Sequence, residues 1–440
     1  MVRRTLTLRS EILRLVSPSC FRACPSRICQ VRSLSSTSAS TINPPKAKRS
    51  EPNPAASKAL IDALQFLDTE LEWIKLYMST VISSKRNNVG ALTERNSKGN
   101  DVLDHAASYL LASPGKLIRP ALVLLLSYCC VSSPQTKQKI QRALRKDIVK
   151  LRRIVANQNP QDSAGKPMAG RNPPMEEYTF PALPSRFENI LLLACITEFI
   201  HVASLLHDDV IDNAATRRGK PSLYALRGTK VSVLAGDFLF SRACGLSTLL
   251  NSIPVVSLMS SALEELVRGE LLQMGEIIDT SSYYEKNYRK TGSLLEKSLT
   301  SAMILMNRSS RHPRVRKAAG FGSHLGQAFQ IIDDCLDFSG SEDVIGKPRL
   351  ADLREGTFTL PVILAVEKDP STKAILSQKM SDADIDEVIR RVTALNTVQE
   401  AKTCADGELG AAMRCLDSFP QCKARRILEG VAQYIITRNS

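Results

Sequence analysis

The chain has 440 residues, enough for one large domain or two ordinary ones, and a formal net charge of +15. Much of the positive excess is concentrated in residues 1–50, so the net charge does not favour a nucleic-acid-binding protein. The 11 cysteines are scattered without metal-ligand spacing, which excludes a disulfide framework and a zinc site.

Residues 1–50 have the composition of a targeting segment. They are rich in arginine and serine, contain the single acid Glu11, and include an amphipathic stretch at 6–16. This composition is typical of a mitochondrial transit peptide, although a disordered basic tail would have the same composition. We predict a transit peptide at 1–40, a linker at 41–56 and a location in the mitochondrial matrix.

Apolar residues recur at helical spacing through most of 57–128 and 187–438. Helix-forming residues are plentiful, aromatic residues are few, and glycine and proline clusters separate the segments. We therefore predict one all-α domain over 57–438. No apolar run approaches the length of about 20 residues that crosses a bilayer, so we expect a soluble or peripheral protein.

Residues 131–186 interrupt this helical pattern. A basic run is followed by a stretch rich in proline, glycine and asparagine that ends at Pro184. We predict a surface insertion, with a short basic helix followed by a disordered loop. The insertion is either a solvated loop or a contact with an anionic membrane or a partner subunit. RNA is disfavoured, because the basic run lacks aromatic residues for stacking.

Two copies of one acidic signature dominate the domain: Asp208-Asp209-Val210-Ile211-Asp212 and Asp333-Asp334-Cys335-Leu336-Asp337. Each places carboxylates at i, i+1 and i+4 of an apolar segment expected to be helical, so the first and last share one helix face. Such carboxylates repel one another and destabilise the helix unless a cation offsets the repulsion. One such motif would fit a solvated acidic patch equally well, but two with basic partners favour Mg²⁺ that bridges to a phosphate.

Four basic elements accompany the acidic motifs. They are Gly115-Lys116-Leu117-Ile118-Arg119-Pro120, Thr216-Arg217-Arg218-Gly219-Lys220-Pro221, Lys290-Thr291 and Gly346-Lys347-Pro348. An anion with several charges requires several lysine and arginine donors, and arginine offers two parallel donors to phosphate oxygens. Each element alone is weak support, but together with two carboxylate clusters they indicate two diphosphate sites.

In these stretches the chain resembles the trans-prenyl diphosphate synthases of the polyprenyl synthetase family. The matching segments, in the family's order and spacing, are GKLIRP at 115–120, HVASLLHDDVID at 201–212, TRRGKPS at 216–222, LAGDFLFSRA at 234–243, LVRGELLQM at 266–274, KTG at 290–292 and GQAFQIIDDCLDF at 326–338. The resemblance implies the isoprenoid synthase fold, a bundle of long antiparallel helices around a central active-site cavity. It also implies a homodimer or a heteromer with a related subunit.

The resemblance assigns roles to individual residues. The ligands of the Mg²⁺ ions, about three per active site, would be Asp208, Asp212, Asp333, Asp334 and Asp337, with Asp209 supporting the site. The contacts of the allylic diphosphate would be Arg217, Lys290, Thr291, Gln330 and Lys347. The contacts of isopentenyl diphosphate would be Lys116, Arg119, His201 and Arg218. The residues on which catalysis would chiefly depend are Asp208, Asp212, Arg217, Lys290, Asp333 and Asp334.

The implied activity is Mg²⁺-dependent, repeated condensation of isopentenyl diphosphate onto farnesyl or geranylgeranyl diphosphate, with no nucleic-acid partner. In this family, bulky residues four or five positions before the first acidic motif end chain growth, and here Ser204 and Ala203 are both small. Phe199 lies one more helical turn before the acidic motif, and it is either the floor of the cavity or part of the packed core. We expect a long all-trans polyprenyl diphosphate for the ubiquinone side chain. A mitochondrial geranylgeranyl diphosphate synthase and a non-catalytic subunit of a heteromeric synthase are the alternatives.

Two positions depart from the family pattern. Leu350 stands where the family often has glycine, which would reshape the loop after the second acidic motif, and Gly292 replaces a common alanine after Lys290-Thr291. Neither change removes a predicted ligand, so we expect a catalytically competent protein.

Overall fold

The computed structural model describes residues 54–83, 117–131, 133–158, 183, 186–217, 220–275, 279–307, 309–339, 350–354, 356–376 and 380–437. The predicted transit peptide, most of the linker and residues 159–182 of the insertion lie outside this part of the chain. Three predicted substrate contacts, Lys116, Arg218 and Lys347, lie outside it as well.

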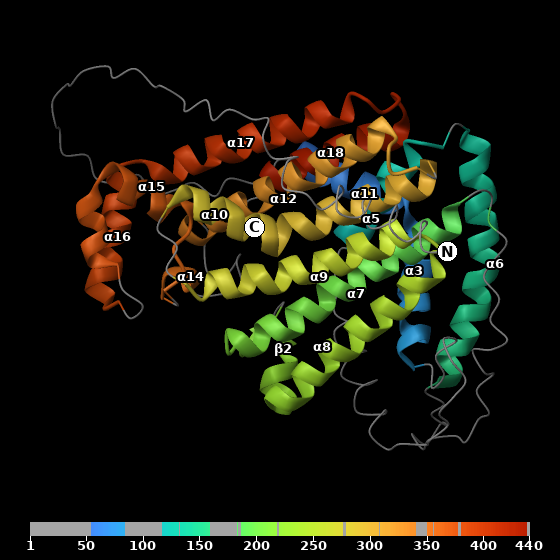
Figure 1. Ribbon diagram of the computed structural model, residues 1–440, viewed down its shortest axis with the longest axis horizontal. Coiled ribbons are helices and arrows are strands. Elements are labelled where there is room, and N and C mark those ends of the chain that lie inside the picture. The colour runs from blue at the N-terminus through green and yellow to red at the C-terminus, as the bar shows by residue number, and fades with distance from the viewer. Residues whose placement is uncertain are drawn as a thin grey trace, which may run out of the picture. The chain divides into compact units, whose positions relative to one another are not determined.

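The described residues are almost entirely helical, which confirms the all-α prediction (Figure 1). The elements before the midpoint are α2 (Pro54–Phe66), α3 (Asp68–Ser83), α5 (Ile118–Tyr128), α6 (Pro134–Gln158), α7 (Phe187–Ile211), β1 (Thr216–Arg217) and β2 (Lys220–Pro221). The later elements are α8 (Leu223–Leu249), α9 (Ile253–Gln273), α10 (Thr280–Asn287), η3 (Tyr288–Gly292), α11 (Ser293–Asn307), α12 (Pro313–Ser339), α14 (Ala351–Arg354), α15 (Leu360–Lys368), η4 (Pro370–Ile375), α16 (Asp382–Ala394), α17 (Thr397–Leu416) and α18 (Lys423–Thr437).

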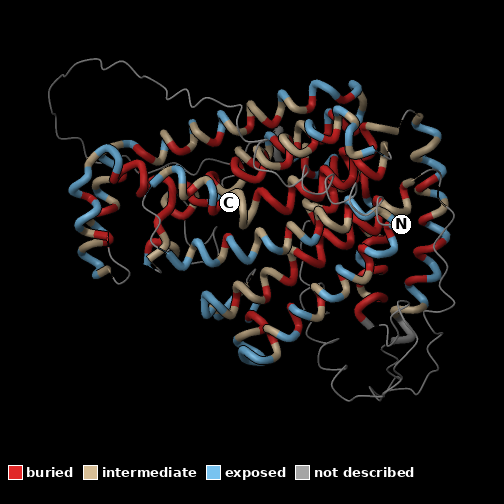
Figure 2. Tube along the Cα trace, viewed as in Figure 1, coloured by how far each residue is buried: buried red, intermediate tan, exposed pale blue. Residues whose placement is uncertain are grey.

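Helix α7 is the central element of the main hydrophobic core. It packs against α8, α5, α11 and α3, and every residue from Ile190 to Ile200 is buried (Figure 2). A helix surrounded by other helices must be apolar on most of its circumference, which explains why α7 lacks a polar face. By length and composition α7 would also cross a bilayer, contrary to the expectation from the sequence that no segment would. Its burial makes it a core helix of the bundle.

Helix α12 carries the second acidic motif and joins two cores. Its first part packs with α11 in the main core, through Phe321 and Leu325. Its last part packs with α15 and α17 in a second core that includes Ile331 and Ile332. Because α11 contacts both α7 and α12, it fixes the two motif-bearing helices relative to each other.

The insertion begins with a helix of 25 residues, α6, much longer than the short helix predicted. One side of α6 is buried against α3, through Ile140, Leu144, Ile148 and Leu151. The single acid of α6, Asp147, is 2% exposed and accepts a hydrogen bond of 2.7 Å from the Trp73 indole of α3. The first part of the insertion is therefore an integral part of the bundle.

Leu350 adopts a left-handed backbone conformation (φ 60°), which explains why a glycine would suit this position. Its side chain is nevertheless 6% exposed and belongs to the second core. Relief of left-handed strain is worth about 1–2 kcal/mol, whereas removing a buried leucine side chain costs about 2–5 kcal/mol. Burial outweighs strain at this position.

We therefore expect Leu350→Gly to lower the free energy of unfolding by about 2 kcal/mol, measured by urea denaturation. Asn396 provides a matched control, since it has a similar φ of 55° but is exposed. Asn396→Gly should change stability by less than about 0.5 kcal/mol. A stabilised Leu350→Gly variant would show that backbone strain dominates at this position.

Candidate active site

Both acidic motifs lie at the carboxyl ends of their helices. Asp208 to Asp212 form the last turn of α7, and Asp333 to Asp337 lie in the last two turns of α12. The carboxyl end of a helix carries partial negative charge, so carboxylates there are destabilised in addition to repelling one another. The fold therefore concentrates negative charge at two helix ends, an arrangement that a cation would stabilise.

The Asp208 carboxyl shows this electrostatic cost directly. Its pKa is raised to about 6, chiefly by burial and also by Glu270 and Asp212, while Lys290 and Arg217 oppose the shift. The carboxyl is therefore surrounded by both acids and bases from α7, α9, η3 and β1. It is poised to ionise fully when additional positive charge arrives.

The turn after α7 places Arg217 beside the first motif. The helix ends at Ile211 with Asp212 as its C-cap, and the next residue, Asn213, has a left-handed φ of 49°, a conformation that asparagine tolerates. The chain then forms the short β1–β2 hairpin, and Arg217 Nε donates to Asp209 Oδ1 at 2.6 Å. Asp209 is fully buried, so this ion pair holds it inside the protein while Asp208 is half-buried and Asp212 is exposed.

Lys290 and Thr291 lie in η3, a single π-helical turn between α10 and α11. Such turns shift the side-chain register of a helix and are frequent at functional sites. The η3 turn approaches α9 so closely that a Cβ atom on Gly269 would lie 2.8 Å from Lys290 Cγ. Lys290 Nζ lies 2.6 Å from Glu270 Oε2 and 3.0 Å from Gln273 Oε1. These contacts from α9 hold the ammonium group near enough to Asp208 to lower the pKa of its carboxyl.

The second motif is joined to η3 by a chain of hydrogen bonds. Thr291 Oγ1 donates to Gln330 Oε1 at 2.9 Å, and Gln330 Nε2 donates to Asp334 Oδ1 at 2.9 Å. The Tyr283 hydroxyl of α10 donates to the other oxygen, Asp334 Oδ2, at 2.6 Å. Both carboxylate oxygens of Asp334 are thus hydrogen-bonded within the protein.

Asp334 is the most deeply buried acid of its motif. It is 2% exposed, and burial raises its pKa to about 6 although Lys286 opposes the shift. Asp333 is exposed and Asp337 is 8% exposed. In each motif, therefore, the second aspartate is anchored inside the protein by a named partner, and the first is more accessible.

Arg119 and His201, two predicted contacts for isopentenyl diphosphate, lie together although they are 82 residues apart. Arg119 NH1 lies 2.9 Å from His201 Nε2, with Arg119 on α5 and His201 on α7. His201 is seven residues, about two turns, before Asp208, so the two side chains share one face of α7. This geometry supports a role at the site more than a role in the core.

Carboxylate oxygens are the ligands that Mg²⁺ prefers, and the charge balance at Asp208 fits a divalent cation. Among the described residues, no three His, Cys, Asp or Glu side chains are already arranged to hold a metal ion. Mg²⁺ commonly takes one or two carboxylates and completes its coordination with water and substrate phosphates. The accessible acids Asp208, Asp212 and Asp333 fit such a shared site.

Several residues that contact the site could not be found from the motifs. Glu270 and Gln273 hold Lys290, and Tyr283 and Lys286 surround Asp334. Glu270 and Gln273 lie in segment 266–274, which resembles the family. That resemblance was the signal in the sequence that could have identified them. No spacing in the sequence marks Tyr283, because it reaches Asp334 from another helix.

Comparisons with known proteins place the chain among similar sequences of one family. A family model described as polyprenyl synthetase matches residues 176–395. A probable mitochondrial hexaprenyl pyrophosphate synthase of Yarrowia lipolytica is 33% identical over 420 residues, covering 89% of this chain and 91% of that protein. Decaprenyl-diphosphate synthase subunit 1 of Schizosaccharomyces pombe is 34% identical over 351 residues, covering 77% of this chain and 85% of that protein.

The same fold occurs in the crystal structure of a polyprenyl synthase from Caulobacter crescentus complexed with calcium and isoprenyl diphosphate. The TM-score is 0.65 at 22% sequence identity, and the match covers 89% of this chain and 100% of that chain. This likeness establishes a common helical architecture for the two proteins.

Proposed function

The chain belongs to the polyprenyl synthetase family and is a prenyltransferase of that family, and from this premise we propose its reaction. The protein condenses isopentenyl diphosphate repeatedly onto farnesyl or geranylgeranyl diphosphate and makes a long all-trans polyprenyl diphosphate. The observation that carries the proposal is the convergence of Asp208, Arg217 and Lys290 from three segments of the chain. Carboxylates for a metal and cations for a diphosphate are combined there.

The product supplies the ubiquinone side chain in the mitochondrial matrix. Support comes from relatives in Yarrowia lipolytica and Saccharomyces cerevisiae, whose names include hexaprenyl pyrophosphate synthase and the mitochondrion. The arginine-rich, serine-rich segment 1–40 supports the same compartment.

The residues of the chain bind and orient the two substrates. Lys290, Thr291 and Arg217 contact the allylic diphosphate, and Arg119 and His201 contact the diphosphate of isopentenyl diphosphate. Bound Mg²⁺ supplies further positive charge to the departing diphosphate. As the allylic C–O bond breaks, Lys290 and Arg217 stabilise the negative charge that develops on the leaving group.

The double bond of isopentenyl diphosphate then attacks the allylic cation, and a proton is lost to the released diphosphate. No nucleophile from the protein is needed for this sequence. A cavity walled by apolar helices such as α7 keeps water from the cation.

Two ion pairs hold the cations that would contact the allylic diphosphate. Arg217 pairs with Asp209, and Lys290 pairs with Glu270. Arg217 has further donors besides its Nε, so it is able to hold Asp209 and a phosphate oxygen together. The pairs thus keep both cations in place before the diphosphate arrives.

The test is a product assay with the chain from residue 51 onward, which forms a compact unit of its own. It is given isopentenyl diphosphate, farnesyl diphosphate and Mg²⁺, and the dephosphorylated products are separated by chain length. We expect polyprenyl products well beyond geranylgeranyl. Products that end at geranylgeranyl would assign the alternative function and make Phe199 the floor, and no product would indicate a missing partner subunit.

We propose that the active form is an oligomer that uses the exposed apolar face of α9. Val267 and Leu271 of α9 and its C-cap residue Met274 lie on one face and are 60%, 62% and 58% exposed. Exposed apolar side chains gathered on one face are typical of a protein contact. The Schizosaccharomyces pombe relative is named as subunit 1, which supports a heteromer. Light scattering on the purified chain distinguishes a heteromer from a homodimer.

Replacing Tyr283 by phenylalanine is expected to lower kcat/KM about tenfold, because a hydrogen bond to a charged group contributes about 1.5–3 kcal/mol. The variant should also need more Mg²⁺ for half-maximal rate, because Asp334 loses a donor that fixes the second motif. Tyr284→Phe is the control, since its hydroxyl faces Cys404 instead. An unchanged Mg²⁺ requirement in Tyr283→Phe would mean that the Tyr283 hydroxyl does not position this motif.

A further inference from the structure

Helix α6 has two faces of opposite character. Its buried face packs on α3, whereas its exposed face carries seven cations, here named the basic face of α6: Lys139, Arg142, Arg145, Lys146, Lys150, Arg152 and Arg153. At 100° per residue these positions span about 160° of the helix, and at 1.5 Å per residue they extend over about 21 Å. The face therefore forms a continuous positive strip.

The positive charge of this strip is largely uncompensated. The one acid of α6, Asp147, is buried on the opposite side and bonded to Trp73. Within the described parts of the chain, Arg152 is the single member of the strip in an ion pair, with Glu72 of α3. A strip of this kind raises the local concentration of polyanions.

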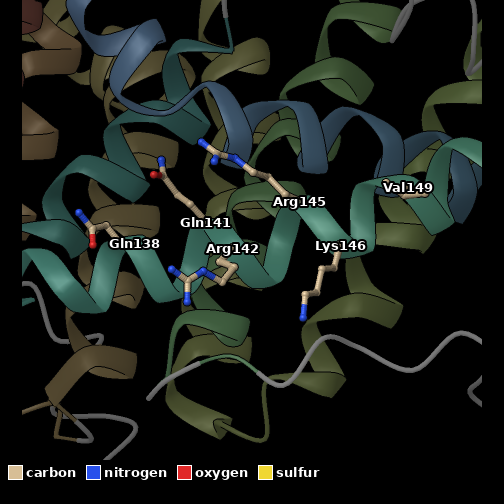
Figure 3. A pocket seen from close by; sticks show the side chains of 6 residues that line it. All are labelled: Gln138, Gln141, Arg142, Arg145, Lys146 and Val149. Atoms are coloured by element: carbon tan, nitrogen blue, oxygen red, sulfur yellow. The ribbon is translucent and has the colours of Figure 1, made fainter.

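The strip also contains a hollow of about 500 Å³ (Figure 3). Its lining residues are Gln138, Gln141, Arg142, Arg145, Lys146 and Val149. In Figure 3 the side chains of Arg142 and Lys146 extend to the same side of α6. Arg142 and Lys146 together offer several hydrogen-bond donors on that side, which suits a phosphate group.

We propose that the basic face of α6 docks on a bilayer that contains anionic phospholipids, with a headgroup phosphate in the hollow. Clusters of four to eight lysines and arginines on a helix are the charge pattern that anionic membranes attract. A protein partner fits less well, because Val149 is the one large apolar side chain exposed on this face and interfaces have an apolar centre. RNA fits less well, because the strip carries no aromatic side chain for base stacking.

The docking surface also suits the proposed function, on which this part of the inference rests. A long polyprenyl chain is apolar and partitions into a bilayer, so a synthase held at the surface would release its product where the product dissolves. The charge pattern of α6 carries the inference without this argument.

The test compares two charge-matched triple variants of the full chain for binding to vesicles. One variant carries Arg142→Gln, Arg145→Gln and Lys146→Gln. The control carries Arg316→Gln, Lys317→Gln and Lys373→Gln, three exposed cations on α12 and η4. The basic segment 1–50 is the same in both proteins, so the difference between the variants reports on α6 alone.

Binding is measured by sedimentation with phosphatidylcholine vesicles that contain about 30% phosphatidylglycerol. Each cation removed should weaken binding about fivefold, so the α6 variant should bind about 100-fold more weakly than the control. Binding of the wild type should fall with added salt and be absent on pure phosphatidylcholine. Both variants should keep the prenyltransferase activity of the wild type on water-soluble substrates. Loss of activity in all three proteins would therefore reject the proposed function and not the docking surface.

Equal vesicle binding by the two triple variants would overturn the proposal. It would also be overturned if the α6 variant kept its vesicle binding but lost affinity for a labelled single-stranded RNA, which would assign the strip to RNA. Circular dichroism of each variant verifies that the helices remain, because the three substituted positions are exposed and should not affect packing.

Discussion

Replacing Asp208 by asparagine is expected to reduce turnover by about 1,000-fold while the helical fold remains intact. Removing one electrostatic contact to the developing charge of a reaction typically costs about 100- to 1,000-fold in rate, and Asp208 would also lose a metal ligand. Asparagine keeps the size of the side chain, so the effect reports on charge. The measurement is the steady-state rate with saturating isopentenyl and farnesyl diphosphates.

The same substitution should not destabilise the metal-free protein. Burial raises the pKa of Asp208 from 3.8 to about 6, so the folded protein binds this proton more tightly than the unfolded chain does. Stability therefore falls as the pH rises from about 4 to about 6, and the ionised carboxylate is unfavourable at pH 7. Asp208→Asn removes this pH dependence, and its thermal midpoint at pH 7 without Mg²⁺ should equal or exceed that of the wild type.

Two comparisons make the result interpretable. Asp406→Asn changes an exposed aspartate of α17 and should keep both activity and stability. Asp333→Asn, at the accessible position of the second motif, should lose activity to a similar extent as Asp208→Asn. Near-normal turnover in either motif variant would refute the assignment of that aspartate to the metal. A large drop in the metal-free thermal midpoint of Asp208→Asn would make the carboxylate a structural residue instead.

The sequence located the two acidic motifs correctly on helices but could not separate the roles of their members. Asp208 and Asp209 are adjacent, and only the three-dimensional arrangement reveals that Arg217 anchors Asp209 in the interior. Likewise, the hydrogen bond from Tyr283 to Asp334 joins residues of two helices that are 51 positions apart in the chain. Local spacing predicts which side chains share a helix face, whereas partners on other helices depend on packing.

In the insertion, by contrast, the sequence did contain the signal for a long packed helix, but the composition of the segment led to the prediction of a short one. Ile140, Leu144, Ile148 and Leu151 follow one another at intervals of four and three residues, the spacing of a buried helix face. The numerous cations and the proline- and glycine-rich segment that follows suggested a short helix on the surface. Long charged side chains on the outer face are compatible with a 25-residue packed helix, because they remain in solvent while the opposite face is buried.

Product length provides the second large effect, and here burial separates two positions that the sequence treated alike. Ser204 is half-buried and lies one turn before Asp208 on the same face of α7, whereas Ala203 is fully buried within the core. We expect Ser204→Phe to end chain growth at or below geranylgeranyl, because a bulky ring blocks the path about 5.4 Å from the acidic motif. Ala203→Phe should mainly overpack the core and lower stability by about 1–3 kcal/mol. Chromatography of the products together with urea denaturation checks both results. If instead Ala203→Phe shortens the product and Ser204→Phe leaves it long, the growing chain follows the opposite side of α7.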